Sequence, residues 1–471
     1  MKINKLKVVP ELDPGFIPAE KWNSAFRAMA RDCAATNYFR WGIESPDGSI
    51  STYMAKLLPH ECPEYKKLNV LYVERTLKFL LWSKGGSKIY LSGDESLCRE
   101  IQEIYSLTGS RSFDVDFAGK VFDCVLQVEI VDVIPEANET STEFGRDLTG
   151  CRIGFDLGGS DRKCAALIDG KVVYSEEIAW DPYFEEDPQY HIDGIRDSLN
   201  RAAAKLPHVD SIGGSAAGIY LNNDVQVSSL FRGVSAKNFD DSIKRVFHDL
   251  QHEWNDIPFK VVNDGEVTAL AGAMSLNDSA VLGISMGTSL AAGYVNSKGN
   301  ITLGLNELAF APIDYRDDAP IDEWSGDRGC GVQYFSQQGV ARLIRKAGID
   351  EIDSDLPFAE QLVLLQNLMK QNNSQARKIY ETIGVCFGYS IAHYAEFYTI
   401  RNLLILGRVT SGEGGDIIIQ KAEEVLSVEY PALAKQINIC IPNEKDKRHG
   451  QAVAAATLPQ VRLEKAHKSL C

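Results

Sequence analysis

The sequence predicts an α/β protein with two or three domains. From Cys151 onward, apolar strand patterns alternate with helical patterns, as in layered α/β domains. The chain has 471 residues, whereas one domain usually takes roughly 100–200. Residues 133–150 are polar and contain Pro, Gly and Thr, which is typical of an interdomain linker. We therefore expect an N-terminal α/β region with linker at 1–150, and two further domains at 151–275 and 276–471.

Composition and charge argue against several classes of protein. Hydrophobic residues make up 44% and charged residues 24%, which are ordinary globular values. The net charge of -16 repels phosphate backbones, so nucleic-acid binding is not expected. Ten cysteines are scattered without close pairs, which predicts reduced thiols. No apolar run approaches the ~18 residues of a membrane helix, so we expect a cytoplasmic protein without membrane contact.

The sequence of the N-terminal region predicts a small α/β unit. Phe39–Leu58 resembles two strands joined at Asp47-Gly48, because Asp-Gly favours a hairpin turn. A strand at Lys88–Ser92 follows a helical stretch, and further strands are expected around Phe113–Val131. A winged helix-turn-helix here would indicate a transcription regulator. The strand at Lys88–Ser92 falls where a recognition helix would be needed, which argues against DNA binding.

The first chemical motif is a glycine pair after a predicted strand. Gly158 and Gly159 allow backbone N–H groups to approach phosphate oxygens, because they carry no Cβ. Asp156 could hold Mg²⁺ through water, and Ser160 could donate a hydrogen bond to a phosphate. The alternative is a glycine-rich β-turn without a ligand.

The second motif is an apolar strand that ends in two polar residues. Phe259–Val262 delivers Asn263 and Asp264 to the carboxyl end of a strand, where ligands gather in open α/β sheets. Asp264 is a candidate general base for an alcohol, and Asn263 could hold a neighbouring hydroxyl. The alternative is a helix N-cap, since Asn and Asp both cap well.

Two more glycine loops follow apolar strands. Gly287 and Thr288 could grip a β- or γ-phosphate from the other side, unless they form an ordinary hairpin turn. Gly407 and Gly412 follow a fully apolar strand and could make room for a base and ribose, unless they form a routine connection to a helix. Each loop alone is a weak signal, and the order of the four motifs strengthens the interpretation.

Together the four motifs resemble the ROK family (repressors, open reading frames and kinases) of the actin, hexokinase and Hsp70 ATPase superfamily. The resemblance covers roughly Cys151 to Leu458, about two thirds of the chain. It implies two RNase H-like lobes of the actin-like ATPase fold around a cleft, with an additional N-terminal region. It also implies a sugar kinase that uses ATP and Mg²⁺, with sugar and nucleotide as small-molecule partners. Relatives often form dimers or tetramers, so a homodimer is one expectation.

The resemblance assigns roles residue by residue. Asp264 would be the general base, and Asp156 the Mg²⁺ residue. The sugar would be bound by Asn263, Glu307 and Gly214. The nucleotide would be bound by Asp156, Gly158, Gly159, Ser160, Gly287, Thr288, Gly407 and Gly412.

The sequence departs from the family at its zinc motif. Phe310 stands where the family has a zinc-binding histidine, and only Cys330 remains of the cysteine cluster. One thiolate cannot form the usual four-coordinate site, so we expect no zinc and expect packing by Phe310 instead. The loss also leaves open an alternative, a non-catalytic sugar sensor that keeps the kinase fold and uses the N-terminal region as its output module.

Overall fold

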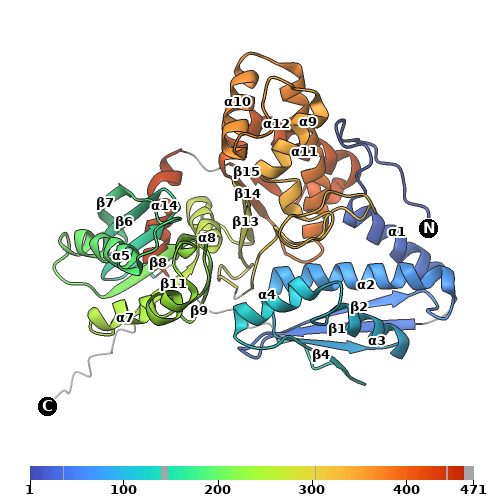
Figure 1. Cartoon of the computed structure of the whole chain (residues 1–471), viewed down its shortest axis with the longest axis horizontal. Helices are drawn as coiled ribbons and strands as arrows, with labels where there is room; N and C mark the ends of the chain where they lie inside the picture. The colour runs from blue at the N-terminus through green and yellow to red at the C-terminus, as the bar shows by residue number, and fades with distance from the viewer. Residues whose placement is uncertain (35–36, 139–146, 303, 442–443, 461–471) are drawn as a thin grey trace. The chain divides into compact units, whose positions relative to one another are not determined.

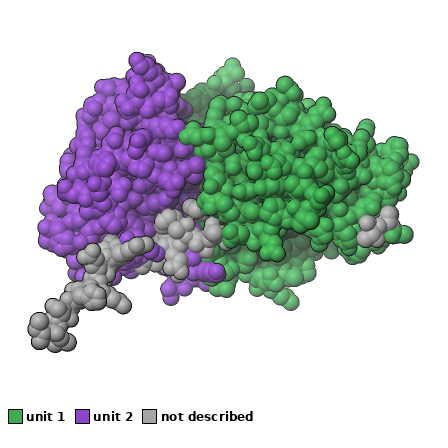
Figure 2. Space-filling view, turned by 90° about the horizontal axis from the view of Figure 1, so that it is seen from below, with its two compact units in different colours: residues 1–141, 279–297, 302–441 green, residues 142–278, 298–301, 442–471 purple. Residues whose placement is uncertain are grey.

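The computed structural model divides into two compact units, coloured separately in Figure 2. Unit 1 comprises residues 1–141, 279–297 and 302–441; unit 2 comprises residues 142–278, 298–301 and 442–471. The described residues are 1–34, 37–138, 147–302, 304–441 and 444–460, with the backbone alone for 444–449. Within them, none of the helices combines the length and apolar character that a membrane crossing requires.

The N-terminal part of unit 1 is a four-stranded sheet with helices. The predicted hairpin is confirmed: β1 (Asn37–Glu44) and β2 (Ile50–Leu57) pair antiparallel, and Gly48 in the turn has a φ of 82°. The sheet order is β2-β1-β3-β4, and α2 runs along the sheet in Figure 1. The remaining elements are α1 (Ala19–Asp32), α2 (Pro63–Lys84), β3 (Lys88–Ser92), α3 (Glu95–Ile104), α4 (Ser112–Phe122) and β4 (Gln127–Ile130).

The prediction of strands throughout Phe113–Val131 was wrong in its first half. Ser112–Phe122 forms α4, and only Gln127–Ile130 is a strand. Phe113 and Phe117 are four residues apart, so in a helix they lie on one face, and both pack against the core of unit 1.

The rest of unit 1 is a second four-stranded sheet covered by long helices. Its order is β13-β12-β14-β15; β12 pairs antiparallel with β13 and parallel with β14, and β14 pairs parallel with β15. The apolar strand β14 (Asn402–Leu406) is buried along most of its length, as its sequence predicts. The other elements are β12 (Val281–Met286), β13 (Leu290–Val295), α9 (Gln337–Ala347), α10 (Phe358–Lys370), α11 (Ser374–Tyr394), α12 (Glu413–Glu429), α13 (Pro431–Ala434) and β15 (Asn438–Cys440).

Unit 2 is built on a five-stranded sheet of order β11-β8-β5-β6-β7. The strands β11, β8 and β5 are parallel, whereas β5, β6 and β7 form an antiparallel meander. The elements are β5 (Cys151–Leu157), β6 (Asp161–Ile168), β7 (Lys171–Ala179), α5 (Pro188–Ala203), β8 (Ser211–Ala216), β9 (Ile219–Leu221), β10 (Asp224–Val227), α6 (Ala236–Asn238), α7 (Val246–Glu253), β11 (Phe259–Asn263), α8 (Asp264–Leu276) and α14 (Glu444–Ala456).

Alternating residues of β5 contact different helices. Ile153, Phe155 and Leu157 belong to one apolar cluster with residues of α5 and α7. On the opposite face α14 packs against β5, β6 and β8, and α8 packs against α14. Because side chains alternate along a strand, Asp156 points to the opposite face from Phe155 and Leu157.

The expected division at residues 150 and 275 differs from the observed units in two respects. Residues 442–471, expected in the last domain, group with unit 2, where Arg152 donates hydrogen bonds to the carbonyls of Ala456 (3.2 Å) and Pro459 (2.7 Å). The N-terminal region groups with unit 1 instead of standing alone. Part of the expected linker, residues 139–146, lies outside the described residues. This grouping depends on contacts between segments that are far apart in the chain. Local sequence patterns do not reveal such contacts.

Candidate active site

Asp156 and Asp264 lie at the same end of the sheet in unit 2. Asp156 pairs with Ser215 of β8, which in turn pairs with Val262 of β11. Asp264 follows two residues after Val262 and begins α8. One strand separates β5 from β11, so their backbones lie about 10 Å apart. The two carboxylates therefore converge at one sheet edge, as parallel strand ends predict.

The electrostatics of the two carboxyl groups are coupled. Burial, together with the negative charge of Asp156, raises the pKa of Asp264 to about 6. Burial also raises the pKa of Asp156, which is 4% exposed, while Lys163 opposes that rise. Ser215 donates a hydrogen bond of 2.6 Å to Asp156 Oδ1, and Lys163 Nζ lies 3.6 Å from Oδ2. Asp156 is thus held in a fixed position beside a positive charge.

Asn263 acts as the N-cap of α8. Its Oδ1 accepts a hydrogen bond of 2.7 Å from the backbone N–H of Gly265. Its side-chain amide donates a hydrogen bond of 2.6 Å to the carbonyl of Gly218. Both ends of the side chain are therefore engaged within the protein, and Asn263 orients the chain at Asp264.

The first glycine loop, Gly158 to Ser160, joins β5 to β6. Its backbone is fixed by hydrogen bonds from Gly158 N–H to the Asp161 carbonyl (2.9 Å) and from the Trp180 indole to the Gly158 carbonyl (2.7 Å). A Cβ at Gly159 would lie 2.0 Å from the Tyr183 hydroxyl, so the close approach of that hydroxyl requires glycine. Tyr183 therefore reaches the loop that was predicted to hold phosphate.

Two charged residues beside this loop were missed by the sequence reading. Asp161 accepts a hydrogen bond of 3.0 Å from Ser160 Oγ and forms an ion pair with Lys163. Lys163 sits directly across the hairpin from Asp156. If Gly158–Ser160 is taken as the turn of a hairpin, residue 156 of the first strand faces residue 163 of the second. The sequence therefore contained enough information to place Lys163 beside Asp156.

Gly214 lies on β8, but its surroundings are explained by packing. A Cβ there would lie 2.2 Å from the ring of Phe155 on the neighbouring strand. The structure places Gly214 one residue before Ser215, the hydrogen-bond donor to Asp156.

The other two glycine loops lie side by side in unit 1. Gly287 and Thr288 connect β12 to β13, and Gly407 follows β14, the parallel neighbour of β12. Gly407 has a φ of 104°, and a Cβ there would lie 2.4 Å from the carbonyl oxygen of Met286. Only glycine fits at this position. Gly412 precedes α12 with a φ of 70° and open space around it.

Phe310 packs in an aromatic cluster, as expected. Its ring centroid lies 4.5 Å from that of Trp82, 5.6 Å from Phe113 and 6.1 Å from Phe117. Glu307, three residues earlier, is tied to α2 by a hydrogen bond of 2.9 Å from its N–H to the Trp82 carbonyl. Burial raises the pKa of the Cys330 thiol to about 12, so this thiol is neutral at physiological pH.

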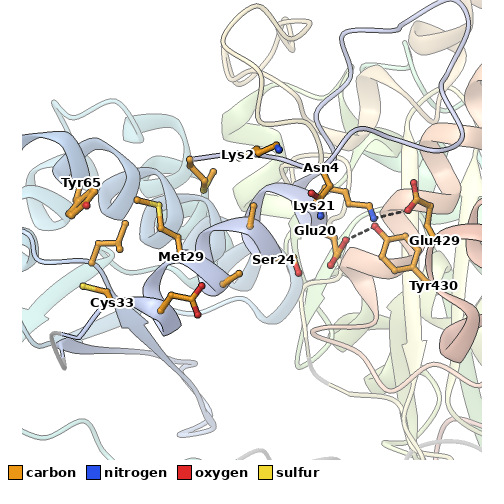
Figure 3. Close-up of a pocket in the computed structure, with 15 residues that line it drawn as sticks. Lys2, Asn4, Glu20, Lys21, Ser24, Met29, Cys33, Tyr65, Glu429 and Tyr430 are labelled. Atoms are coloured by element: carbon orange, nitrogen blue, oxygen red, sulfur yellow. Dashed lines mark hydrogen bonds and ion pairs between the residues drawn. The ribbon is translucent and has the colours of Figure 1, made fainter.

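A pocket of about 870 Å³ in unit 1 contains none of the predicted site residues. Figure 3 shows it between the N-terminal segment, α1 and the end of α12. Four of its polar residues form two pairs: Lys21 pairs with Glu429 at 2.9 Å, and the Tyr430 hydroxyl donates a hydrogen bond to Glu20. We assign it no ligand.

Comparison with known proteins supports the fold. No model of a known protein family matches the sequence, and no curated protein sequence matches it. Solved structures do match. A ROK hexokinase from Thermus thermophilus is 13% identical, with a TM-score of 0.51 over 66% of this chain and 97% of its own. The chain has the fold of the ROK sugar kinases.

Other ROK proteins share this fold. A ROK family transcriptional regulator, a homolog of the E. coli MLC protein, is 15% identical, with a TM-score of 0.51 over 66% of this chain and 78% of its own. A ROK glucokinase from Streptomyces griseus, solved with glucose and AMPPNP, is 17% identical, with a TM-score of 0.49 over 65% of this chain and 98% of its own. The hexokinase and the regulator, each aligned with 66% of this chain, confirm the predicted two-lobed α/β fold, and about a third of the chain lies outside these alignments.

Proposed function

We propose that the protein phosphorylates a sugar hydroxyl with ATP, and that Asp264 is the general base. One observation carries the proposal: Asp264 lies at the same sheet edge as Asp156, and its pKa is raised to about 6. A general base works best when its pKa is near the working pH, so a carboxylate raised in this way suits the removal of an alcohol proton. Fold alone does not decide activity, and the site residues supply the argument.

The residues at the sheet edge have separate roles in phosphoryl transfer. Asp264 accepts the proton of the attacking hydroxyl, and the backbone N–H of Gly265 orients its carboxylate by donating a hydrogen bond of 2.9 Å to Oδ1. Lys163 offers positive charge near the first glycine loop. Phosphoryl transfer depends mainly on positioning and on stabilising charge, which these groups provide.

The Asp156 carboxylate, which Ser215 orients at the carboxyl end of β5, fits a Mg²⁺ ion held through water. Oxygen ligands are those that Mg²⁺ prefers, and Mg²⁺ commonly retains waters beside one or two carboxylates. When bound, the ion would neutralise charge on the nucleotide phosphates. In unit 1, Gly287 and Thr288 would bind phosphate groups of ATP. Gly407 and Gly412 would make room for its nucleoside.

A coupled assay of ADP release tests this function. Wild-type protein with ATP and Mg²⁺ should release ADP when a hexose, an amino sugar or a polyol is added. ADP release that is independent of every added sugar would reject the kinase proposal.

The kcat/KM of the enzyme is expected to fall as the pH drops below about 6. Asp264 must be ionised to accept a proton, so kcat/KM should fall about tenfold per pH unit below its pKa and level off about one unit above it. The measurement is kcat/KM from pH 4.5 to pH 8 at saturating Mg²⁺. A flat profile between pH 5 and pH 7 would argue that Asp264 does not titrate during catalysis.

A sugar-sensing regulator is the second candidate, and Asp161 favours it. Its carboxylate engages both Ser160 and Lys163, the two groups that would otherwise face a phosphate. A ROK regulator is also among the proteins that share the fold. A sensor has no need of nucleotide, so calorimetry with ATP and Mg²⁺ separates the two candidates.

Asp161→Asn is expected to tighten ATP binding in a kinase. Removing a negative charge near the triphosphate and freeing Lys163 should contribute about 1 kcal/mol, or about fivefold in Kd. The Kd of ATP with Mg²⁺ is measured for both proteins by calorimetry, and Asp249→Asn, an exposed site on α7, serves as the control. No detectable ATP binding by either protein would favour the sensor.

A further inference from the structure

A second pocket in unit 1 combines aromatic and acidic residues. Its volume is about 370 Å³, enough for a single sugar ring. Most of its residues come from the chain segment 310–338, and one, Ser289, comes from the loop between β12 and β13. It is lined by Ser289, Phe310, Asp322, Glu323, Trp324, Val332 and Gln338.

Trp324 is the most unusual residue of this pocket. Its side chain is 70% exposed, although most tryptophans are largely buried. The indole packs in tilted contacts against Phe310, at 5.8 Å between ring centroids, and against Phe113, at 6.5 Å. An exposed, supported indole offers a rigid flat surface that costs little entropy when a ligand stacks on it. The C–H face of a pyranose ring suits such a surface.

The charged groups of the pocket are both carboxylates, Asp322 and Glu323. Asp322 is buried, and its Oδ2 accepts hydrogen bonds from Ser325 N–H (2.7 Å) and Ser325 Oγ (2.6 Å). Glu323 is exposed beside it, and Gln338 accepts a hydrogen bond of 2.9 Å from Gln333. Among the described residues that line the pocket there is no Lys, Arg or His. Hydroxyl or ammonium donors match this lining, whereas phosphate or carboxylate groups are repelled.

The N-terminal region supports the aromatic wall from behind. Trp82 of α2 and Phe113 and Phe117 of α4 contact Phe310. The same region holds Asp327, three residues after Trp324, through Arg75 (2.8 Å). Lys78 and Arg111 add ion pairs of 3.0 and 2.7 Å to Asp327. The wall therefore depends on contacts with the N-terminal region.

We propose that this pocket binds a sugar ring without an anionic substituent by stacking it on Trp324, and that the N-terminal region positions that wall and so limits which ring fits. The inference rests on the proposed function in taking the ligand to be the sugar substrate. It gives the N-terminal region a role in specificity, in place of the output module considered from sequence alone.

Sugar binding without nucleotide tests the stacking. Calorimetry is performed on the full chain with glucose, mannose, N-acetylglucosamine and glucosamine, and with glucose 6-phosphate and glucuronate. We expect at least one of the first four to bind, and the two anionic sugars to bind about tenfold more weakly or not at all. Equal affinity for an anionic sugar, or no binding by any of the first four, would overturn the proposal.

Two substitutions at Trp324 separate stacking from folding. Trp324→Ala should weaken binding of the preferred sugar about tenfold or more, whereas Trp324→Phe keeps an aromatic face and should stay within about threefold. Leu107→Ala, an equally exposed apolar site on the surface, is the matched control. Unchanged affinity in Trp324→Ala would overturn the proposal.

Phe113 tests the positioning role, because it supports Trp324 without lining the pocket. Phe113→Ala should raise the KM for sugar and leave kcat nearly unchanged, and Phe113→Leu should restore most of the lost affinity. A fall in kcat with an unchanged KM would contradict the positioning role.

Failure of this inference is distinguishable from failure of the kinase proposal. Sugar binding that needs Trp324, without any ADP release, would reject the kinase and keep the pocket. Sugar-dependent ADP release with the same KM in Trp324→Ala would keep the kinase and reject the pocket.

Discussion

Replacing Asp264 with asparagine is expected to lower sugar-dependent turnover about 10²-fold or more. Asparagine keeps the size of the side chain but cannot accept the hydroxyl proton. Sugar affinity should change little, because no negative charge is needed for the sugar to bind. The measurement is kcat from ADP release together with the Kd of the sugar from calorimetry.

The control for this prediction is Asp249→Asn, which removes an exposed carboxylate of α7 in the same unit. It should keep wild-type turnover. If Asp264→Asn also keeps it, Asp264 has no part in the mechanism. If the Kd of the sugar rises in step with the loss of kcat, Asp264 binds the sugar instead of activating it.

Replacing Asp327 with alanine is expected to lower the free energy of unfolding by about 3–5 kcal/mol. The three buried cations around it would then share only the carboxylates of Glu74 and Asp114, so one positive charge would be uncompensated. The Asp327 carboxylate is 5% exposed and meets Arg75, Lys78 and Arg111. These cations hold its pKa well below the usual range, although burial opposes them. Denaturant unfolding of the full chain, followed by tryptophan fluorescence, measures the loss.

The pH dependence of this contribution follows from the lowered pKa. A carboxyl group whose folded-state pKa is depressed stabilises the fold above its unfolded pKa of about 3.9, and this stability is lost progressively in acid. Wild-type stability should therefore fall below about pH 4 more steeply than that of Asp327→Ala. Glu95→Ala, which breaks the exposed pair of Glu95 and Arg99, is the control and should change stability little. A similarly small change in Asp327→Ala would contradict a stabilising role for this cluster.

Local sequence patterns predicted much of the fold. In the candidate site they predicted that Asp156 and Asp264 follow strands of one sheet. The turn at Asp47-Gly48 specifies the β1–β2 hairpin, and the apolar run before Asn263 specifies β11. In both cases the signal lies within a few neighbouring residues. The order of motifs along the chain then brings Asp156 and Asp264 to one sheet edge, since parallel strands align their carboxyl ends.

The features that sequence reading missed depend on contacts between distant segments. Phe113 and Phe117 suit a strand as well as a helix, and only their packing against Phe310 settles the matter. The ion pairs of Asp327 join residues about 250 positions apart, beyond the reach of any local pattern. Asp161 was overlooked for another reason: its effect depends on the direction of the Ser160 hydroxyl, which no composition rule contains.

The most direct test of the kinase proposal is to follow the fate of the γ-phosphoryl group by ³¹P NMR, in a mixture of protein, ATP, Mg²⁺ and the sugar that binds best. The proposal predicts a sugar phosphate monoester that accumulates together with ADP and that fails to appear with Asp264→Asn. Inorganic phosphate as the sole product, or ATP that remains unchanged after prolonged incubation, would contradict it.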